Sequence, residues 1–155
     1  MKKIFSLIAV MLLGATSLFA QNPDKGLSWA VEGGIGSEFE IGGRAQYNFN
    51  KYVAWDVLNA KYAYDYNKHG DWNELTFTTG VRGFSPTFGP NLKAFAALDL
   101  GYGLAFDGNF NDSNFALDFT IGLYVWKGLY AGYGLGLLSN NGNHKDHLLR
   151  VGYNF

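Results

Sequence analysis

The chain has 155 residues, a formal net charge of −1 and no cysteine, and only 16% of its residues are charged. This length suits a single domain, and the lack of a basic excess argues against a nucleic-acid partner. Without cysteine the chain forms neither a disulfide-stapled fold nor a lipid-modified cysteine at a mature N-terminus.

Residues 1–20 have the features of a secretory signal peptide. Lys2 and Lys3 give a positive start, residues 4–13 are mostly apolar, and Ala20 offers a cleavage point before Gln21. The apolar stretch is short for a membrane-spanning helix, which favours cleavage over an uncleaved anchor. We therefore expect residues 21–155 to form the mature domain.

The mature part contains no stretch of about 20 apolar residues that would form a spanning helix. Instead, apolar and polar residues alternate with period two in runs separated by Asn-, Asp- and Gly-rich segments, which indicates β-strands. A change of phase near Leu58 predicts a β-bulge in the third run. Eight runs are predicted: Gly26–Gly36, Phe39–Asn48, Tyr52–Tyr64, Asn73–Phe84, Leu92–Phe106, Phe115–Trp126, Gly128–Leu138 and His147–Phe155.

The segments that connect the runs alternate in character. Tight turns follow the second and sixth runs, and a short segment with two prolines follows the fourth. Longer polar segments follow the third, fifth and seventh runs, although the first connection, near Ser37–Glu38, is short and breaks this pattern. Short turns at one end and longer loops at the other are typical of a transmembrane barrel.

The polar face of the runs decides between a membrane barrel and a soluble barrel of the lipocalin type. In Leu92–Phe106 this face is mostly Gly and Ala, with Lys93 and Asp99 as its charges, whereas a soluble surface is richer in Lys and Glu. Small residues with few charges suit the narrow lumen of eight strands. Aromatic residues form candidate girdles at both ends: Tyr47, Phe49, Tyr52 and Trp55, and Tyr62, Tyr64, Tyr66 and Trp72. The sequence therefore predicts an all-β, eight-stranded antiparallel up-and-down transmembrane β-barrel.

The last run ends in an aromatic residue. A barrel in lipid has no open edge, so the last strand must pair with the first. The ending "VGYNF" resembles the recognition signal of bacterial outer-membrane β-barrel proteins, and the whole mature chain resembles their small eight-stranded type, similar to outer-membrane proteins X and A. The resemblance implies a Gram-negative outer membrane, with lipid and lipopolysaccharide around the barrel. It also implies that Val151, Tyr153 and Phe155 form the signal that the barrel-assembly machinery reads.

Charged residues recur on the predicted lumen face. Closing the last run on the first and pairing the others through their turns gives an order of alternating sign round the wall: Arg150, Glu32, Arg44, Asp56 and Arg82. Opposite partners offset the cost of burying each charge, so this belt is expected to plug the lumen and fix the strand register. Glu40, Lys61 and Glu74 are expected to form a second layer toward the loops.

The predicted order of the belt depends on three assumed pairings between residues of neighbouring runs. The pairings are a two-residue turn at Ser37–Glu38, Asn48 opposite Lys51, and Tyr64 opposite Asn73. Bulky residues are expected to fill the lumen further: Tyr124, Trp126 and Tyr130.

Three segments are candidates for metal binding or catalysis. His144 and His147, beside Asp146, have a spacing that metal ligands use, but such residues in a loop are more often solvated. Asp107–Asp118 is similar to a calcium loop but has Asp112 where that loop needs glycine. Ser139 resembles the Ser-Asn run of a lipid A deacylase, but Leu137 stands where that family has histidine. We therefore expect no catalytic residue, no metal and no cofactor.

The expected function is structural, or recognition of an unknown extracellular ligand by the loops. Two alternatives stay open at this stage: a narrow ion- or solute-conducting pore, and an outer-membrane enzyme that modifies lipid.

Overall fold

The computed structural model describes residues 25–64, 73–107, 109–139 and 144–155, which form eight antiparallel strands. Residues 1–24, which include the predicted signal peptide, lie outside this part, as do Tyr66 and Trp72 of the predicted girdle. The strands are β1 (Gly26–Gly36), β2 (Phe39–Asn50), β3 (Val53–Tyr64), β4 (Asn73–Phe84), β5 (Lys93–Asp107), β6 (Asn109–Trp126), β7 (Leu129–Ser139) and β8 (His144–Asn154).

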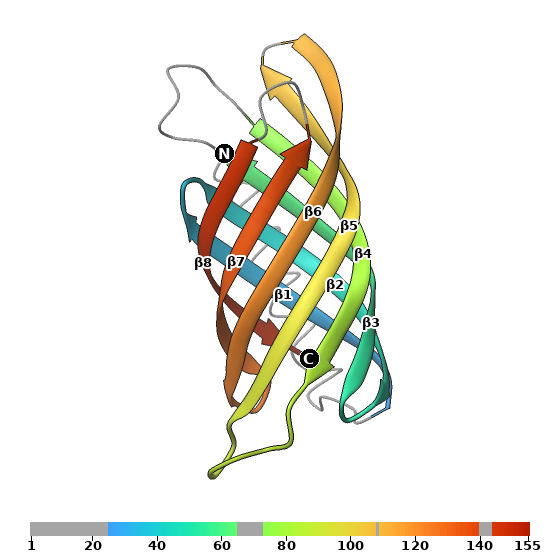
Figure 1. The fold of residues 1–155 in the computed structure, drawn as a ribbon, viewed down its shortest axis with the longest axis vertical. Helices are drawn as coiled ribbons and strands as arrows, with labels where there is room; N and C mark the ends of the chain where they lie inside the picture. Colours follow the sequence, from blue (N-terminus) through green and yellow to red (C-terminus); the bar gives the residue numbers. More distant parts are fainter. Residues whose placement is uncertain (1–24, 65–72, 108, 140–143) are drawn as a thin grey trace, which may run out of the picture.

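The strands close into a barrel in which each pairs with its sequence neighbours and β8 pairs with β1 (Figure 1). At this seam Ala30–Gly36 pairs with Leu148–Asn154. The predicted fold and the predicted pairing of the last run with the first are therefore confirmed. No helix in the described part of the chain is long and apolar enough to cross a membrane.

Two strands begin earlier than the alternation predicts. β6 begins at Asn109 and pairs with the end of β5, where a polar loop was expected. β8 begins at His144 and pairs with Leu138. Backbone pairing continues in these polar segments, but hydrophobic alternation marks a strand only where one of its two faces is apolar.

The predicted bulge in the third run is confirmed. The three-residue step from Asp56 to Asn59 on β3 is matched by a two-residue step from Gly80 to Thr78 on β4. The extra residue reverses the inside–outside alternation, so both Asp56 and Asn59 point into the lumen and are fully buried.

The register corrects two of the three assumed pairings. Ile35 pairs with Phe39 across a three-residue turn, so Glu32 lies opposite Gly42 rather than Gly43. Residues that lie directly opposite each other point to the same face, and this shift is what puts Glu32 on the same face as Arg44.

The turn between β2 and β3 lies later than assumed. Asn50 pairs with Val53, and its side-chain Oδ1 accepts hydrogen bonds from the backbone N–H groups of Tyr52 and Val53. This Asn-based turn was missed in favour of Asn48 opposite Lys51. The third assumed pairing, Tyr64 opposite Asn73, is confirmed.

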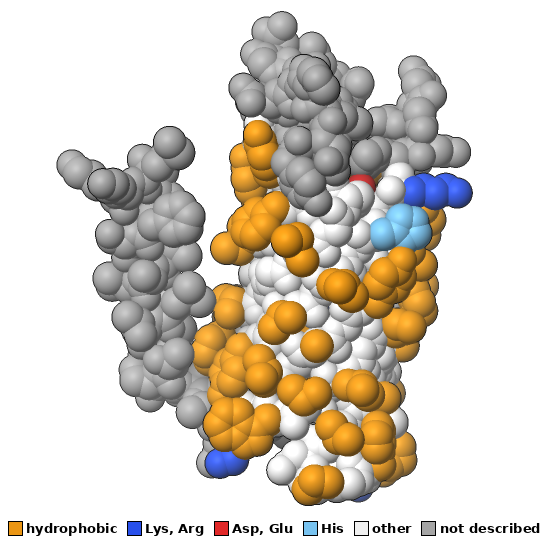
Figure 2. Space-filling view, turned by 90° about the vertical axis from the view of Figure 1, so that its left-hand side faces the viewer, with side chains coloured by type: hydrophobic (Ala, Val, Ile, Leu, Met, Phe, Trp, Pro, Cys, Tyr) orange, Lys and Arg blue, Asp and Glu red, His pale blue; other side chains and the backbone are white. Residues whose placement is uncertain are grey.

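The two faces of the wall differ as predicted: the exposed face is apolar and the buried face is polar. Figure 2 shows hydrophobic side chains over the outer wall of the barrel. Trp126 corrects one assignment. It was expected in the lumen, but it is 58% exposed because the register of β6 against β7 shifts between Tyr124 and Trp126. Exposed members of the predicted girdles are Tyr47, Phe49, Tyr52, Trp55, Tyr62 and Tyr64.

Candidate functional site in the barrel lumen

The centre of the lumen is a network of buried ion pairs. Arg44 donates from Nη1 to Oε2 of Glu32 at 3.1 Å, and its Nε lies 3.5 Å from Oδ1 of Asp56. Arg82 donates to the other oxygen of Asp56 from both Nε and Nη2, each at 3.1 Å. Four predicted belt residues therefore lie in the predicted sequence Glu32, Arg44, Asp56 and Arg82, with opposite charges in contact.

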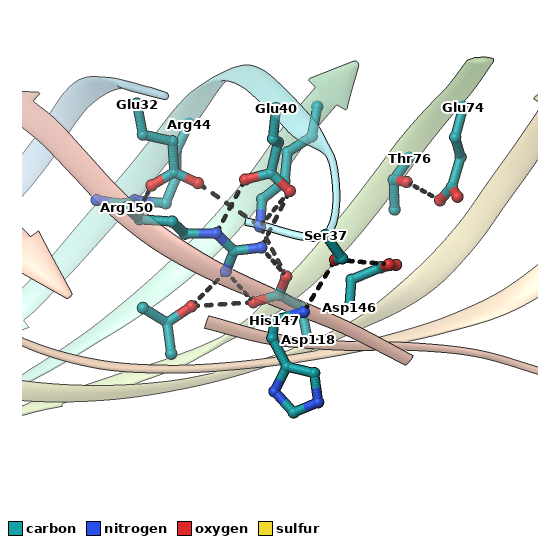
Figure 3. Close-up of polar contacts among 12 residues, drawn as sticks. Glu32, Ser37, Glu40, Arg44, Glu74, Thr76, Asp118, Asp146, His147 and Arg150 are labelled. Atoms are coloured by element: carbon teal, nitrogen blue, oxygen red, sulfur yellow. Dashed lines mark hydrogen bonds and ion pairs between the residues drawn. The ribbon is translucent and has the colours of Figure 1, made fainter. Parts of the chain in front are cut away.

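Arg150 lies in the lumen but does not pair with its predicted partner, Glu32. It was placed beside Glu32, but it lies opposite Gly34 and reaches two other carboxylates. Its Nε and Nη2 donate to Glu40 at 2.9 and 3.0 Å, and its Nη1 and Nη2 donate to Asp118 at 2.7 and 2.6 Å (Figure 3). Arg150 of β8 thus connects β2 and β6 through these two carboxylates, in place of the predicted contact with Glu32.

Lys61 joins the two halves of the network. Its Nζ lies 2.9 Å from Asp118, 3.6 Å from Glu32 and 3.9 Å from Glu40. Lys61 and Glu40 were predicted to form a separate second layer, but these contacts merge both residues into the belt. Three carboxylates round the buried ammonium of Lys61 offset part of the hydration that it loses on burial.

Sequence reasoning missed Asp118 as a member of the network, and it placed Tyr130 in the lumen without its contact to Glu32. Asp118 is the shared acceptor of Lys61 and Arg150, and the Tyr130 hydroxyl donates to Oε2 of Glu32 at 2.5 Å. Both residues lie on the polar face of their runs, which was the available signal. The predicted belt was built from pairs of residues on adjacent strands. These contacts instead join strands that face each other across the lumen, and the turns between adjacent strands do not show which residues meet in this way.

An aromatic cluster closes the lumen on the side of the tight turns. Phe95, Tyr124 and Tyr130 are buried, with ring centroids 5.2 to 5.5 Å apart, and Phe84 packs against them. The guanidinium of Arg44 lies over the Tyr130 ring and that of Arg82 over the Phe95 ring. These cation–π contacts connect the cluster to the ion pairs, so the two form one plug.

Glycines on the lumen wall make room for the largest side chains. A Cβ at Gly134 would lie 2.5 Å from Nη1 of Arg150, and a Cβ at Gly152 would lie 2.3 Å from the Tyr130 hydroxyl. The glycine-rich stretch 132–137 is therefore a packing feature of a narrow lumen, as strand glycines often are.

A small cavity lies between the network and the loop end of the barrel. Its volume of about 30 Å³ has room for a water-sized molecule and no larger solute. Glu74, the remaining predicted member of the second layer, lines this cavity and accepts a hydrogen bond from Thr76 (Figure 3). Asp146 also lines it and accepts a hydrogen bond from Ser37.

The other candidate sites gain no support as reactive centres. Among the described residues, no group of three or more His, Asp or Glu side chains is arranged to hold a metal ion. His147 contacts the Tyr133 hydroxyl on the outer wall, whereas the side chains of His144, Ser139, Asp107 and Asp112 lie outside the described part.

Comparison with known proteins identifies similar folds but no sequence family. No protein-family model matches the chain, and no curated protein sequence matches it. A crystal structure of Neisserial surface protein A is similar, with a TM-score of 0.57 and 18% identity over 83% of this chain and 92% of that one. The N-terminal β-barrel domain of OprF from Pseudomonas aeruginosa is similar, with a TM-score of 0.53 and 17% identity over 83% of this chain and 96% of that one. The chain therefore has the fold of small eight-stranded outer-membrane barrels.

Proposed function

We propose that the protein is an integral outer-membrane barrel with a closed lumen, and that its role is structural or depends on recognition of an extracellular ligand by its loops. Its proposed surroundings are outer-membrane lipid and lipopolysaccharide. The plug of buried ion pairs and aromatic rings is the observation that carries the proposal, because it fills the space that a solute would need to cross.

The outer wall supports the membrane placement. Leu, Val, Ile or Phe side chains point outward on all eight strands, and most of the exposed Tyr and Trp residues lie toward the strand ends. In water such a wall would be a very large apolar patch, whereas in lipid it is the favourable surface.

The inner wall supports a non-catalytic role. The carboxylates of Glu32, Glu40, Asp56 and Asp118 are held by arginine and lysine, and the space beside Glu40 and Asp118 admits only a water-sized molecule. A hydrolase needs a nucleophile and base with room for a substrate between them.

Membrane placement is tested by cell fractionation and by gel mobility before and after boiling. We expect the protein in the outer-membrane fraction, with a change in mobility on boiling because heat unfolds the barrel. Recovery of a monomer that stays soluble without detergent would overturn the proposal.

The loop-dependent role is tested by exchanging residues 65–72 and 140–143 for short Gly-Asn turns. Under the recognition reading, cells with these exchanges lose binding to host or bacterial surfaces while the barrel still assembles. Under the structural reading, the exchanges leave binding unchanged, and removal of the whole protein weakens the outer-membrane barrier.

A further inference from the structure

Lysines are distributed round the end of the barrel that holds the tight turns. Lys25 precedes β1, Lys51 lies in the turn between β2 and β3, Lys93 begins β5, and Lys127 lies in the turn between β6 and β7. These four positions follow one another at intervals of two strands round the barrel. We call these four residues the lysine rim.

Three members of the lysine rim lie over aromatic rings. Nζ of Lys51 lies 5.1 Å from the centroid of Tyr52, and Nζ of Lys127 lies 6.0 Å from that of Trp126. Nζ of Lys93, which is half-buried, lies 4.4 Å from the centroid of Phe84 at the mouth of the lumen. Tyr52 and Trp126 are exposed, as aromatic residues are at the boundary between lipid tails and headgroups. The ammonium groups beside them are therefore at headgroup depth.

The described Lys, Asp and Glu side chains that are exposed on the outer surface are all lysines. Lys25, Lys51 and Lys127 are exposed at this rim, whereas the Asp and Glu side chains whose burial the structure gives are all buried. On the face seen in Figure 2, blue side chains lie at the lower end below the hydrophobic wall, and no red ones lie beside them. Lys25, Lys51 and Lys127 thus present positive charge at this end, whereas the acidic side chains whose burial is known are buried.

We propose that the lysine rim binds the phosphate groups of anionic phospholipids in the leaflet that surrounds the tight turns. The inference rests on the proposed membrane placement and adds a lipid preference to it. The ammonium groups of Lys51 and Lys127, held over interfacial rings, and that of the exposed Lys25 each form an ion pair with a phosphate oxygen, which holds that end at the headgroup level. Lipids bound at these separate points also resist tilting of the barrel.

The test measures the association of spin-labelled phosphatidylglycerol and phosphatidylcholine with the full barrel inserted in vesicles. Insertion is checked first by the change in gel mobility on boiling. We expect wild type to prefer phosphatidylglycerol about fivefold, and to lose part of this preference at high salt. The triple variant Lys25→Gln, Lys51→Gln, Lys127→Gln should lose most of this preference, because only the half-buried Lys93 of the rim remains. The three replaced side chains are exposed, so their loss leaves the lumen intact.

Lys145→Gln is the matched control, since Lys145 is an exposed lysine near the opposite end of the barrel. It should keep the preference of the wild type. If the inserted wild-type barrel associates equally with the two lipids, the proposed lipid binding by the lysine rim is wrong, but the membrane placement is not affected. If the wild type does not insert at all, both proposals are wrong. Binding of isolated cell-wall sacculi by wild type but not by the triple variant, without any lipid preference, would show that the rim faces an acidic polymer and would also overturn the proposal.

Discussion

Arg82 and Asp56 form a buried ion pair in the lumen: two guanidinium nitrogens of Arg82 each lie 3.1 Å from one carboxylate oxygen of Asp56. Both side chains are almost fully buried, and the second oxygen of Asp56 faces Arg44. One carboxylate therefore holds two arginines whose other faces lie against the aromatic cluster.

Replacement of Asp56 by leucine should destabilise the barrel by about 3–5 kcal/mol, because it leaves two buried guanidinium groups without their shared partner. Urea unfolding in lipid vesicles measures the change. The double variant Asp56→Leu, Arg82→Leu should recover part of the loss, since one orphaned charge is removed with its partner. If Asp56→Leu is as stable as wild type, the ion pairs of Asp56 are not shielded from water as proposed.

The hydroxyl groups of two neighbouring tyrosines should differ in importance. Tyr130 donates to Glu32 at 2.5 Å, whereas the buried hydroxyl of Tyr124 has no hydrogen-bond partner among the described residues. Tyr130→Phe should therefore cost about 1–3 kcal/mol, and Tyr124→Phe should be close to neutral. The same unfolding experiment compares them, and equal costs would show that the hydrogen bond to Glu32 contributes no stability.

Gly134→Ala should displace the guanidinium of Arg150, because the added Cβ would lie 2.5 Å from its Nη1. We expect a loss of about 1–3 kcal/mol, as for other insertions into a packed interior. Gly33→Ala on β1 is the control, because the nearest atom to the new Cβ is 3.6 Å away. If both alanines are tolerated equally, the lumen is looser than these contacts indicate.

The proposed assembly signal, Val151, Tyr153 and Phe155, gives a prediction in cells. The Phe155 ring packs on that of Tyr153, and its N–H donates to the Trp29 carbonyl beside the seam. Phe155→Ala should lower the amount of protein in the outer membrane and raise the amount degraded before insertion, as seen by immunoblotting of fractions. Leu149→Ala, an exposed residue of the same strand, is the control and should change the amount little. Equal yields of the two variants would remove Phe155 from the signal.

The sequence predicts the fold well because a barrel wall is built from local alternation. Period two in each run gives the strands, and the phase change near Leu58 gives the bulge that turns both Asp56 and Asn59 inward. Contacts between adjacent strands, such as Arg44 with Glu32, depend on the register as well, because the assumed pairing of Glu32 with Gly43 would put the two side chains on opposite faces.

Contacts across the lumen do not follow from the same patterns. Asp118 lies on β6 and meets Lys61 of β3 and Arg150 of β8, none of which is its neighbour in the sheet. Side-chain length and the diameter of the closed barrel decide such contacts. The outward position of Trp126 depends on a local register shift after Tyr124, which the alternation of β6 does not reveal.

The central claim, a membrane barrel closed by its own side chains, is tested most directly by planar-bilayer recording of the pure protein. Eight strands enclose a space that side chains fill, unlike the water-filled channel of 16-stranded porins. We predict no stable conductance on the nanosiemens scale, with at most small and rare openings. Stable nanosiemens-scale channels in the wild-type recording would contradict the closed lumen.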